Sequence, residues 1–129
     1  MAPPSVRPVL VVDDDAAICR VVAAAVAEEG YAAAAAADGA TALALVNAAA
    51  PCLILFDLRM PGMNGWEFAR RYRAPPGPRA PLVCVTAAVD ADAWGAQIGA
   101  AATLGKPFDL DDLVAVVGLY ALPPSSSGA

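Results

Sequence analysis

The clearest strand signal in the chain lies at residues 52–65, "CLILFDLRMPGMNG". A short apolar run ends in a single acid, Asp57, and a loop punctuated by Pro and Gly follows at once. A continuous apolar run of this length is typical of a parallel strand that is buried on both faces. The acid at its end is therefore either a surface residue or a reactive group held by a rigid scaffold.

The rest of the chain repeats this pattern of a strand followed by a helix. Gly30 closes the first helical stretch, and Asp109 is predicted to be the N-cap of the last one. Five such units predict an α/β fold, with a parallel sheet, helices on both of its faces and right-handed crossovers. The predicted strands are 8–12, 31–36, 52–57, 82–86 and 101–105, and the predicted helices are 16–30, 38–50, 63–73, 90–98 and 109–120.

Composition and charge limit the kind of protein. The 129 residues suffice for one domain, predicted at 8–121 between a flexible arm at 1–7 and a disordered tail at 122–129. A net charge of -5 argues against nucleic acid as the main partner, because that role needs clustered Lys and Arg. No apolar run approaches the ~20 residues of a membrane span, and the three cysteines lack metal-like spacing. We therefore expect a cytoplasmic protein with buried thiols.

Polar residues gather where the predicted strands end. Acids occupy residues 13–15 after the first strand, Asp57 ends the third, Thr86 ends the fourth, and Lys106 follows the fifth. Lys106 is the only lysine in the chain. Because the ligand site of an open parallel sheet lies beyond the carboxyl ends of its strands, these side chains are predicted to meet at one edge.

Such a set of residues favours phosphoryl chemistry. Carboxylates that lie close together repel one another and need a cation, and oxygen ligands without histidine suit Mg²⁺. A carboxylate can accept a phosphoryl group, with the protein supplying position and charge neutralisation. Taken alone, the acids at 13–15 fit a helix cap equally well, and Thr86 fits an ordinary strand-end residue. The combination is what points to a reactive site.

Four motifs resemble those of the bacterial two-component response-regulator receiver domain, in its single-domain, chemotaxis-regulator-like form. They are "VLVVDDD", "FDLRMPGMNG", "VTA" and "GAAATLGKPF", and the similarity runs from about Pro8 to Tyr120. The resemblance implies a flavodoxin-like, doubly wound sheet of five parallel strands in the order 2-1-3-4-5, with five helices.

The resemblance also implies roles for individual residues. Asp57 would accept the phosphoryl group, and Asp13 and Asp14 would hold Mg²⁺, with Asp14 the more direct ligand and Asp13 acting largely through water. The backbone carbonyl of Arg59 and the carboxylate of Asp57 would complete the protein's metal ligands.

Two further side chains would contact the phosphoryl group, namely the hydroxyl of Thr86 and the ammonium of Lys106. The peptide bond from Lys106 to Pro107 resembles one that is cis in the family. The chain departs from the family at the switch position, where Thr103 stands in place of the usual Tyr or Phe.

The partners implied by the resemblance are proteins. A histidine kinase or histidine phosphotransfer protein would donate the phosphoryl group. An unknown protein effector would read the face made by the fourth helix, fifth strand and fifth helix. No effector domain follows Tyr120, so output is expected through docking, and a weak homodimer is compatible with this interpretation. The chain would be a switch in a phosphorelay, catalysing only its own phosphorylation and dephosphorylation.

Other functions fit the residues less well. A haloacid-dehalogenase-type phosphohydrolase needs a second acid two residues after the nucleophile, and Arg59 stands there instead. A flavodoxin-like cofactor carrier is disfavoured because the acids at 13–15 would repel a flavin phosphate. Two alternatives stay open: a receiver-shaped interaction module that is not phosphorylated, and a receiver fragment of a larger regulator or hybrid kinase.

Overall fold

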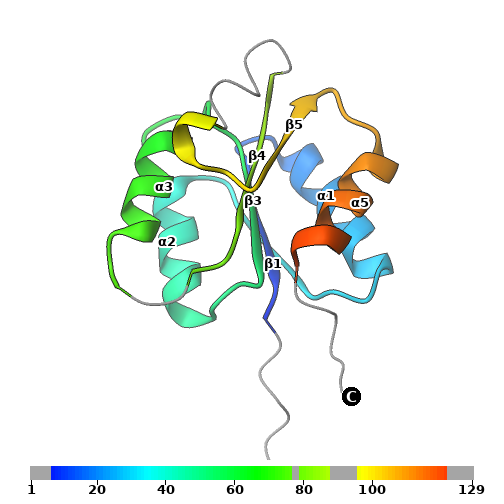
Figure 1. Ribbon diagram of the computed structural model, residues 1–129, viewed down its shortest axis with the longest axis horizontal. Helices are drawn as coiled ribbons and strands as arrows, with labels where there is room; N and C mark the ends of the chain where they lie inside the picture. Colours follow the sequence, from blue (N-terminus) through cyan, green and yellow to red (C-terminus); the bar gives the residue numbers. More distant parts are fainter. Residues whose placement is uncertain (1–6, 77–78, 88–95, 122–129) are drawn as a thin grey trace, which may run out of the picture.

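The computed structural model describes residues 7–76, 79–87 and 96–121, which form a parallel sheet with helices on both faces (Figure 1). Its strands lie in the order β2-β1-β3-β4-β5, so the predicted fold class and strand order are confirmed. The strands are β1 (Val9–Val12), β2 (Ala33–Ala36), β3 (Leu53–Phe56), β4 (Leu82–Ala87) and β5 (Ala102–Lys106).

The helices are divided between the two faces of the sheet. In Figure 1, α1 and α5 cover one face, and α2 and α3 cover the other. Their bounds are α1 (Ala16–Glu28), α2 (Gly39–Ala48), α3 (Gly65–Arg73) and α5 (Leu110–Tyr120). Residues 96–98 are helical and are the described end of the helix predicted over 90–98. The remainder of that prediction lies outside the described residues, as do the arm at 1–6 and the tail at 122–129.

Side-chain caps fix the start of three helices. Asp15 accepts hydrogen bonds from Ala17 N and Ile18 N, Asp38 accepts one from Thr41 N, and Asn64 accepts one from Glu67 N. These bonds satisfy amide groups that have no partner within the helix.

The N-cap of α5 is Asp109, as predicted. Its backbone is extended, and its side chain makes no capping hydrogen bond. Asp111 and Asp112 stand in the first turn instead, where the positive end of the helix dipole favours negative charge.

The sheet carries the core on both sides. Every residue of β1 and β3 is buried, and successive side chains alternate between the two layers of helices. Val9, Val11, Leu53 and Leu55 pack toward α1 and α5, whereas Leu10, Val12, Ile54 and Phe56 pack toward α2 and α3. The alanine strand β2 buries much less and lies at an edge of the sheet, and its first two predicted residues, Tyr31 and Ala32, precede it.

Strand register sets up the site. Val12, the last residue of β1, lies opposite both Ala36 of β2 and Phe56 of β3. The residues that follow Val12 and Phe56 therefore leave neighbouring strands side by side, at the carboxyl edge of the sheet. Those residues are Asp13 and Asp57.

Candidate functional site

Asp13 and Asp57 directly follow β1 and β3 and are held by the backbone there. Asp57 N donates to Val12 O at 3.0 Å, and Asp13 N donates to Ala36 O at 3.0 Å. The hydrogen-bond ladder thus continues one residue beyond each strand. Both acids are buried, with Asp13 3% exposed and Asp57 7% exposed. Each carboxylate therefore starts from a fixed backbone position.

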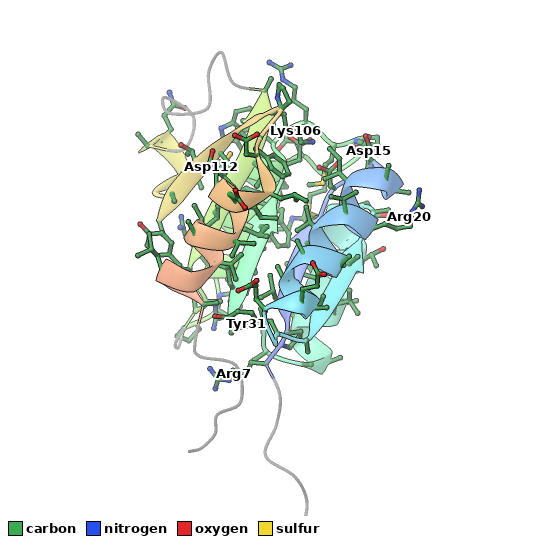
Figure 2. The ribbon with its side chains drawn as sticks, turned by 90° about the vertical axis from the view of Figure 1, so that its right-hand side faces the viewer. Arg7, Asp15, Arg20, Tyr31, Lys106 and Asp112 are labelled. Atoms are coloured by element: carbon green, nitrogen blue, oxygen red, sulfur yellow. The ribbon has the colours of Figure 1, made fainter. Side chains whose placement is uncertain are left out.

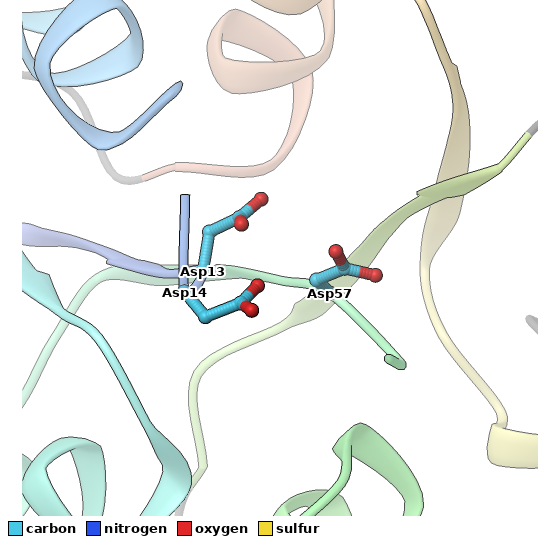
Figure 3. Close-up of side chains that lie close together, drawn as sticks. All are labelled: Asp13, Asp14 and Asp57. Carbon is cyan, nitrogen blue, oxygen red and sulfur yellow. The ribbon is translucent and has the colours of Figure 1, made fainter. Parts of the chain in front are cut away.

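Asp14 joins these two acids in one cluster. Carboxylate oxygens of Asp13, Asp14 and Asp57 lie within 4.8 Å of one another. Figure 3 shows Asp13 and Asp14 extending toward Asp57 across the space between the two strand ends. Asp15 has a different role, because its carboxylate caps α1. The structure thus brings together the three carboxylates that the sequence predicted to hold a metal ion.

Lys106 reaches this cluster from the end of β5. Its Nζ donates to Asp13 Oδ2 at 2.7 Å and to Asp57 Oδ2 at 2.8 Å, so that one ammonium joins two buried carboxylates. Figure 2 shows Lys106 and Asp15 at one end of the molecule, with Tyr31 and Arg7 at the other. Lys106 was predicted to follow its strand; it is instead the last residue of β5.

The electrostatics of the cluster are dominated by negative charge. Burial raises the pKa of Asp13, although the hydrogen bond from Lys106 opposes this effect. Burial alone would lower the pKa of Lys106, but its hydrogen bonds to Asp13 and Asp57 outweigh burial and raise it. The cluster as a whole holds three carboxylates and one ammonium. Such a site attracts a further cation.

Thr86 lies in β4, and Thr103 lies in the neighbouring edge strand β5. Thr86 is 3% exposed and lies opposite Gly105, the neighbour of Lys106. β4 runs one residue further than predicted, to Ala87. Thr103 is half-buried and lies opposite Cys84, two residues before Thr86.

The loop after Asp57 folds back against the strand end. Arg59 N donates to Asp57 Oδ1 at 3.1 Å, and Gly65 N donates to Leu58 O at 2.9 Å. The side chain of Arg59 is exposed. On the other side of the site, the Lys106 to Pro107 peptide bond is cis, as the family resemblance implied.

Two contacts near the acids were not predicted from the sequence. The buried Cys19 thiol donates to the backbone oxygen of Asp13 at 3.2 Å. Gly65 packs directly against the backbone of Asp57 and Leu58. The sequence carried no signal for either contact, because both depend on how separate segments pack together. Cys19, Cys52 and Cys84 are all buried, as predicted.

The helices in the described part of the chain are too short or too polar to cross a bilayer. None of them combines the length and the apolar character that a membrane span requires.

Comparison with known proteins gives one consistent family. The family description "Response regulator receiver domain" matches residues 9–118. The chain is 40% identical over 111 residues to the DNA-binding response regulator MtrA of Mycobacterium tuberculosis, covering 84% of this chain and 48% of MtrA. It is 38% identical over 111 residues to the DNA-binding transcriptional regulator NtrC of Escherichia coli, covering 84% of this chain and 24% of NtrC. The chain thus spans about half the length of MtrA.

Solved structures agree with this family. The chemotaxis response regulator CheY4 of Vibrio cholerae superposes with a TM-score of 0.80 at 30% identity, covering 89% of this chain and 98% of CheY4. The receiver domain of NtrX from Brucella abortus superposes with a TM-score of 0.79 at 29% identity, covering 86% of this chain and 95% of the NtrX chain. The predicted family is therefore confirmed. The chain belongs to the response regulator receiver domain family, whose members act as phosphorylation-dependent switches in two-component signalling.

Proposed function

We propose that Asp57 accepts a phosphoryl group from a phosphohistidine in a reaction that depends on Mg²⁺. The observation that carries this proposal is the double hydrogen bond of Lys106, at 2.7 Å to Asp13 and 2.8 Å to Asp57. It brings the proposed acceptor, the proposed metal ligands and a cation for the phosphoryl group into one buried cluster. Phosphoryl transfer needs this kind of positioning and charge neutralisation more than it needs acid or base chemistry.

The proposed step makes one bond and breaks one. A carboxylate oxygen of Asp57 attacks phosphorus, a new P–O bond forms, and the P–N bond to the donor imidazole breaks. The imidazole leaves with the electron pair and takes a proton from solvent. During this step the ammonium of Lys106 neutralises charge on the phosphoryl oxygens, and the Thr86 hydroxyl donates to one of them. The amide of Arg59 keeps the Asp57 carboxylate in orientation.

The residues at the site fit a magnesium ion. Asp13, Asp14 and Asp57 offer carboxylate oxygens within 4.8 Å of one another, and Mg²⁺ prefers oxygen ligands of this type. The backbone carbonyl of Arg59 is proposed as the fourth protein ligand. When bound, Mg²⁺ would neutralise the excess negative charge of the cluster and of the incoming phosphoryl oxygens.

The phosphoryl donor is proposed to be a histidine kinase or a histidine phosphotransfer protein. This sequence contains no histidine, so the donor imidazole lies outside it. An open, mostly apolar cavity of about 480 Å³ lies between α1 and the segment after β5, and Lys106 forms part of its wall. Ile18, Val21 and Phe108 also line it, and Val21 is 50% exposed. A donor that docks on this cavity would have its histidine next to the acid cluster.

The output is proposed to be a change in protein binding. A phosphoryl group adds roughly -1.5 to -2 charges beside carboxylates that already repel one another, which favours rearrangement of the adjacent loops. The affected face comprises residues 96–98, β5 and α5, and its partner is an effector protein. The DNA-binding activity named for MtrA and NtrC belongs to those proteins, and the net charge of -5 does not favour nucleic acid on this domain.

The proposal is tested with a small phosphodonor. Wild type and Asp57→Asn are incubated with acetyl phosphate, with and without Mg²⁺, and intact mass and base lability of the adduct are measured. We expect one phosphoryl group on wild type with Mg²⁺, and none on the variant or after metal chelation. Labelling of Asp57→Asn at the wild-type level would disprove the assignment. Absence of any adduct on wild type would favour the interaction module that is not phosphorylated.

A further inference from the structure

α3 starts unusually close to the backbone of the proposed phosphoacceptor. Gly65, the first residue of α3, is buried, and its amide donates to Leu58 O at 2.9 Å. A Cβ atom built on Gly65 would lie 2.6 Å from Asp57 O and 2.7 Å from Leu58 Cα. Real Cβ atoms essentially never come this close to another heavy atom. The missing side chain is therefore what lets α3 rest on the end of β3.

Backbone conformation does not account for this glycine. Gly30, Gly62 and Gly99 have positive φ, which glycine adopts readily, but Gly65 is not among them. Gly62 offers the contrast, because a Cβ there would have no described atom within 4 Å. The close packing on Asp57 and Leu58 does account for it, because a side chain has no room there.

This contact adds a second point at which the backbone of the acceptor is held. Asp57 N donates to Val12 O, while Gly65 rests against Asp57 O. The loop from Leu58 to Gly65 is closed by the hydrogen bond that Gly65 N donates to Leu58 O. Arg59, which donates to Asp57 Oδ1, lies within this closed loop. The direction of the carboxylate and the place of the Arg59 backbone thus depend on how closely α3 approaches.

We propose that Gly65 is a positioning residue for phosphoryl transfer, acting by letting the start of α3 pack on the backbone of Asp57 and Leu58. This inference rests on the proposed function of Asp57. It differs from a requirement for helix stability, because the contact sets the position of reacting atoms and does not simply hold α3 in the fold.

An alanine at position 65 would have to displace backbone. Its two closest neighbours are a backbone oxygen and a Cα atom, which cannot rotate away as the end of a flexible side chain can. Phosphoryl transfer is sensitive to such shifts, and a displacement of about 1 Å can lower a rate by about 100-fold. For Gly65→Ala we expect phosphorylation by acetyl phosphate at saturating Mg²⁺ to slow by at least about tenfold.

Two variants serve as matched controls. Gly118→Ala changes a glycine in α5 whose added Cβ would have no described atom within 4 Å. Asn64→Ala removes the side-chain bond to Glu67 N and weakens the start of α3 without adding an atom beside Asp57. Both are expected to be phosphorylated within about twofold of the wild-type rate.

The experiment measures the rate of Asp57 phosphorylation and the Mg²⁺ affinity, from tryptophan fluorescence, at a temperature where circular dichroism shows all four proteins folded. Slow phosphorylation of Gly65→Ala alone supports the inference. A Gly65→Ala rate within about twofold of wild type overturns it, and so does an equal loss in Asn64→Ala, which would point to helix stability. If wild type takes no phosphoryl group, the proposed function fails instead.

A second variant keeps the test decisive if Gly65→Ala does not fold. One glycine inserted after the exposed Gly62 lengthens the loop and lets α3 lift away from Asp57 without any steric clash. We expect phosphorylation of this variant to slow by at least about fivefold, and an unchanged rate would overturn the inference.

Discussion

Asp57, which directly follows β3, and Thr103, within β5, differ in the chemistry and the burial of their side chains. Asp57 is 7% exposed, accepts bonds from Arg59 N and Lys106 Nζ, and has α3 packed against its backbone. Thr103 is a small, half-buried residue that lies opposite Cys84. The proposed phosphoacceptor is thus held by several contacts. At position 103, by contrast, β5 has a threonine where the family commonly has an aromatic residue. We infer that phosphorylation and its transmission can vary independently.

The largest effect is expected from a substitution within the cluster of three acids. Asp14→Asn removes a carboxylate from the cluster of three, so we expect metal-dependent phosphorylation to be abolished. Asp15→Asn should matter far less, because Asp15 caps α1 and asparagine is an equally good cap. Phosphorylation by acetyl phosphate across a Mg²⁺ titration measures both. Equal losses in the two variants would show that the metal ligands are wrongly assigned.

Removing the cation should destabilise the same region. Lys106→Met leaves Asp13 and Asp57 buried without their shared ammonium, and loss of one partner of a buried pair costs roughly 3 kcal/mol. Mg²⁺ should bind more tightly to this variant, by about tenfold, because a competing positive charge is gone. Urea unfolding with and without Mg²⁺ measures both changes.

The matched control is Arg70→Met, which breaks an exposed ion pair with Glu67. Exposed ion pairs contribute little to stability, so this variant should unfold close to wild type. A similar loss of stability in the two variants would contradict the special role of the buried ammonium.

A smaller effect is expected where α3 meets the approach to β5. Arg73 donates to the carbonyl oxygens of Ile98 and Gly99 and so ties the end of α3 to the segment that leads into β5. Arg73→Met keeps much of the side chain but removes these bonds. We expect amide hydrogen exchange at residues 98–101 to quicken about fivefold, with little change in the rate of phosphorylation. Arg70→Met again serves as control. Equal exchange rates in wild type and Arg73→Met would show that the hydrogen bonds of Arg73 do not hold the segment that leads into β5.

The smallest expected effect concerns the missing ring. Beryllofluoride, a phosphoryl mimic, should shift amide NMR signals strongly near the acids and only modestly along α5 in wild type. Thr103→Tyr should enlarge the shifts along α5, because a ring opposite Cys84 can pack differently in the two states. Large shifts across α5 in wild type that the substitution leaves unchanged would show that this receiver transmits fully without an aromatic residue.

The sequence predicted best where one physical requirement dominates. β1, β3 and β4 are buried apolar strands, and short continuous aliphatic runs are typical of strands that are covered on both faces. The acids, Thr86 and Lys106 could be placed at one edge because parallel strands all end there. β2 was harder, since alanine alone does not specify a strand, and its first two predicted residues lie outside it.

What the sequence could not supply were contacts between distant segments. The packing of Gly65 on Asp57 depends on the path of a whole loop. The two hydrogen bonds that Lys106 donates to Asp13 and Asp57 depend on the order of three strands. Asp109 occupies the predicted N-cap position of α5, yet its side chain makes no capping hydrogen bond there. Local propensity gave the position of these residues, and tertiary packing determined their contacts.

The proposal that Asp57 is the phosphoacceptor is tested most directly by locating the phosphoryl group chemically. Wild-type protein treated with acetyl phosphate and Mg²⁺ is reduced with borohydride, which converts an aspartyl phosphate to homoserine, and its peptides are sequenced by mass spectrometry. We predict homoserine at position 57 and aspartate at positions 13, 14 and 15. Homoserine at any of those three positions, with Asp57 unchanged, would contradict the assignment.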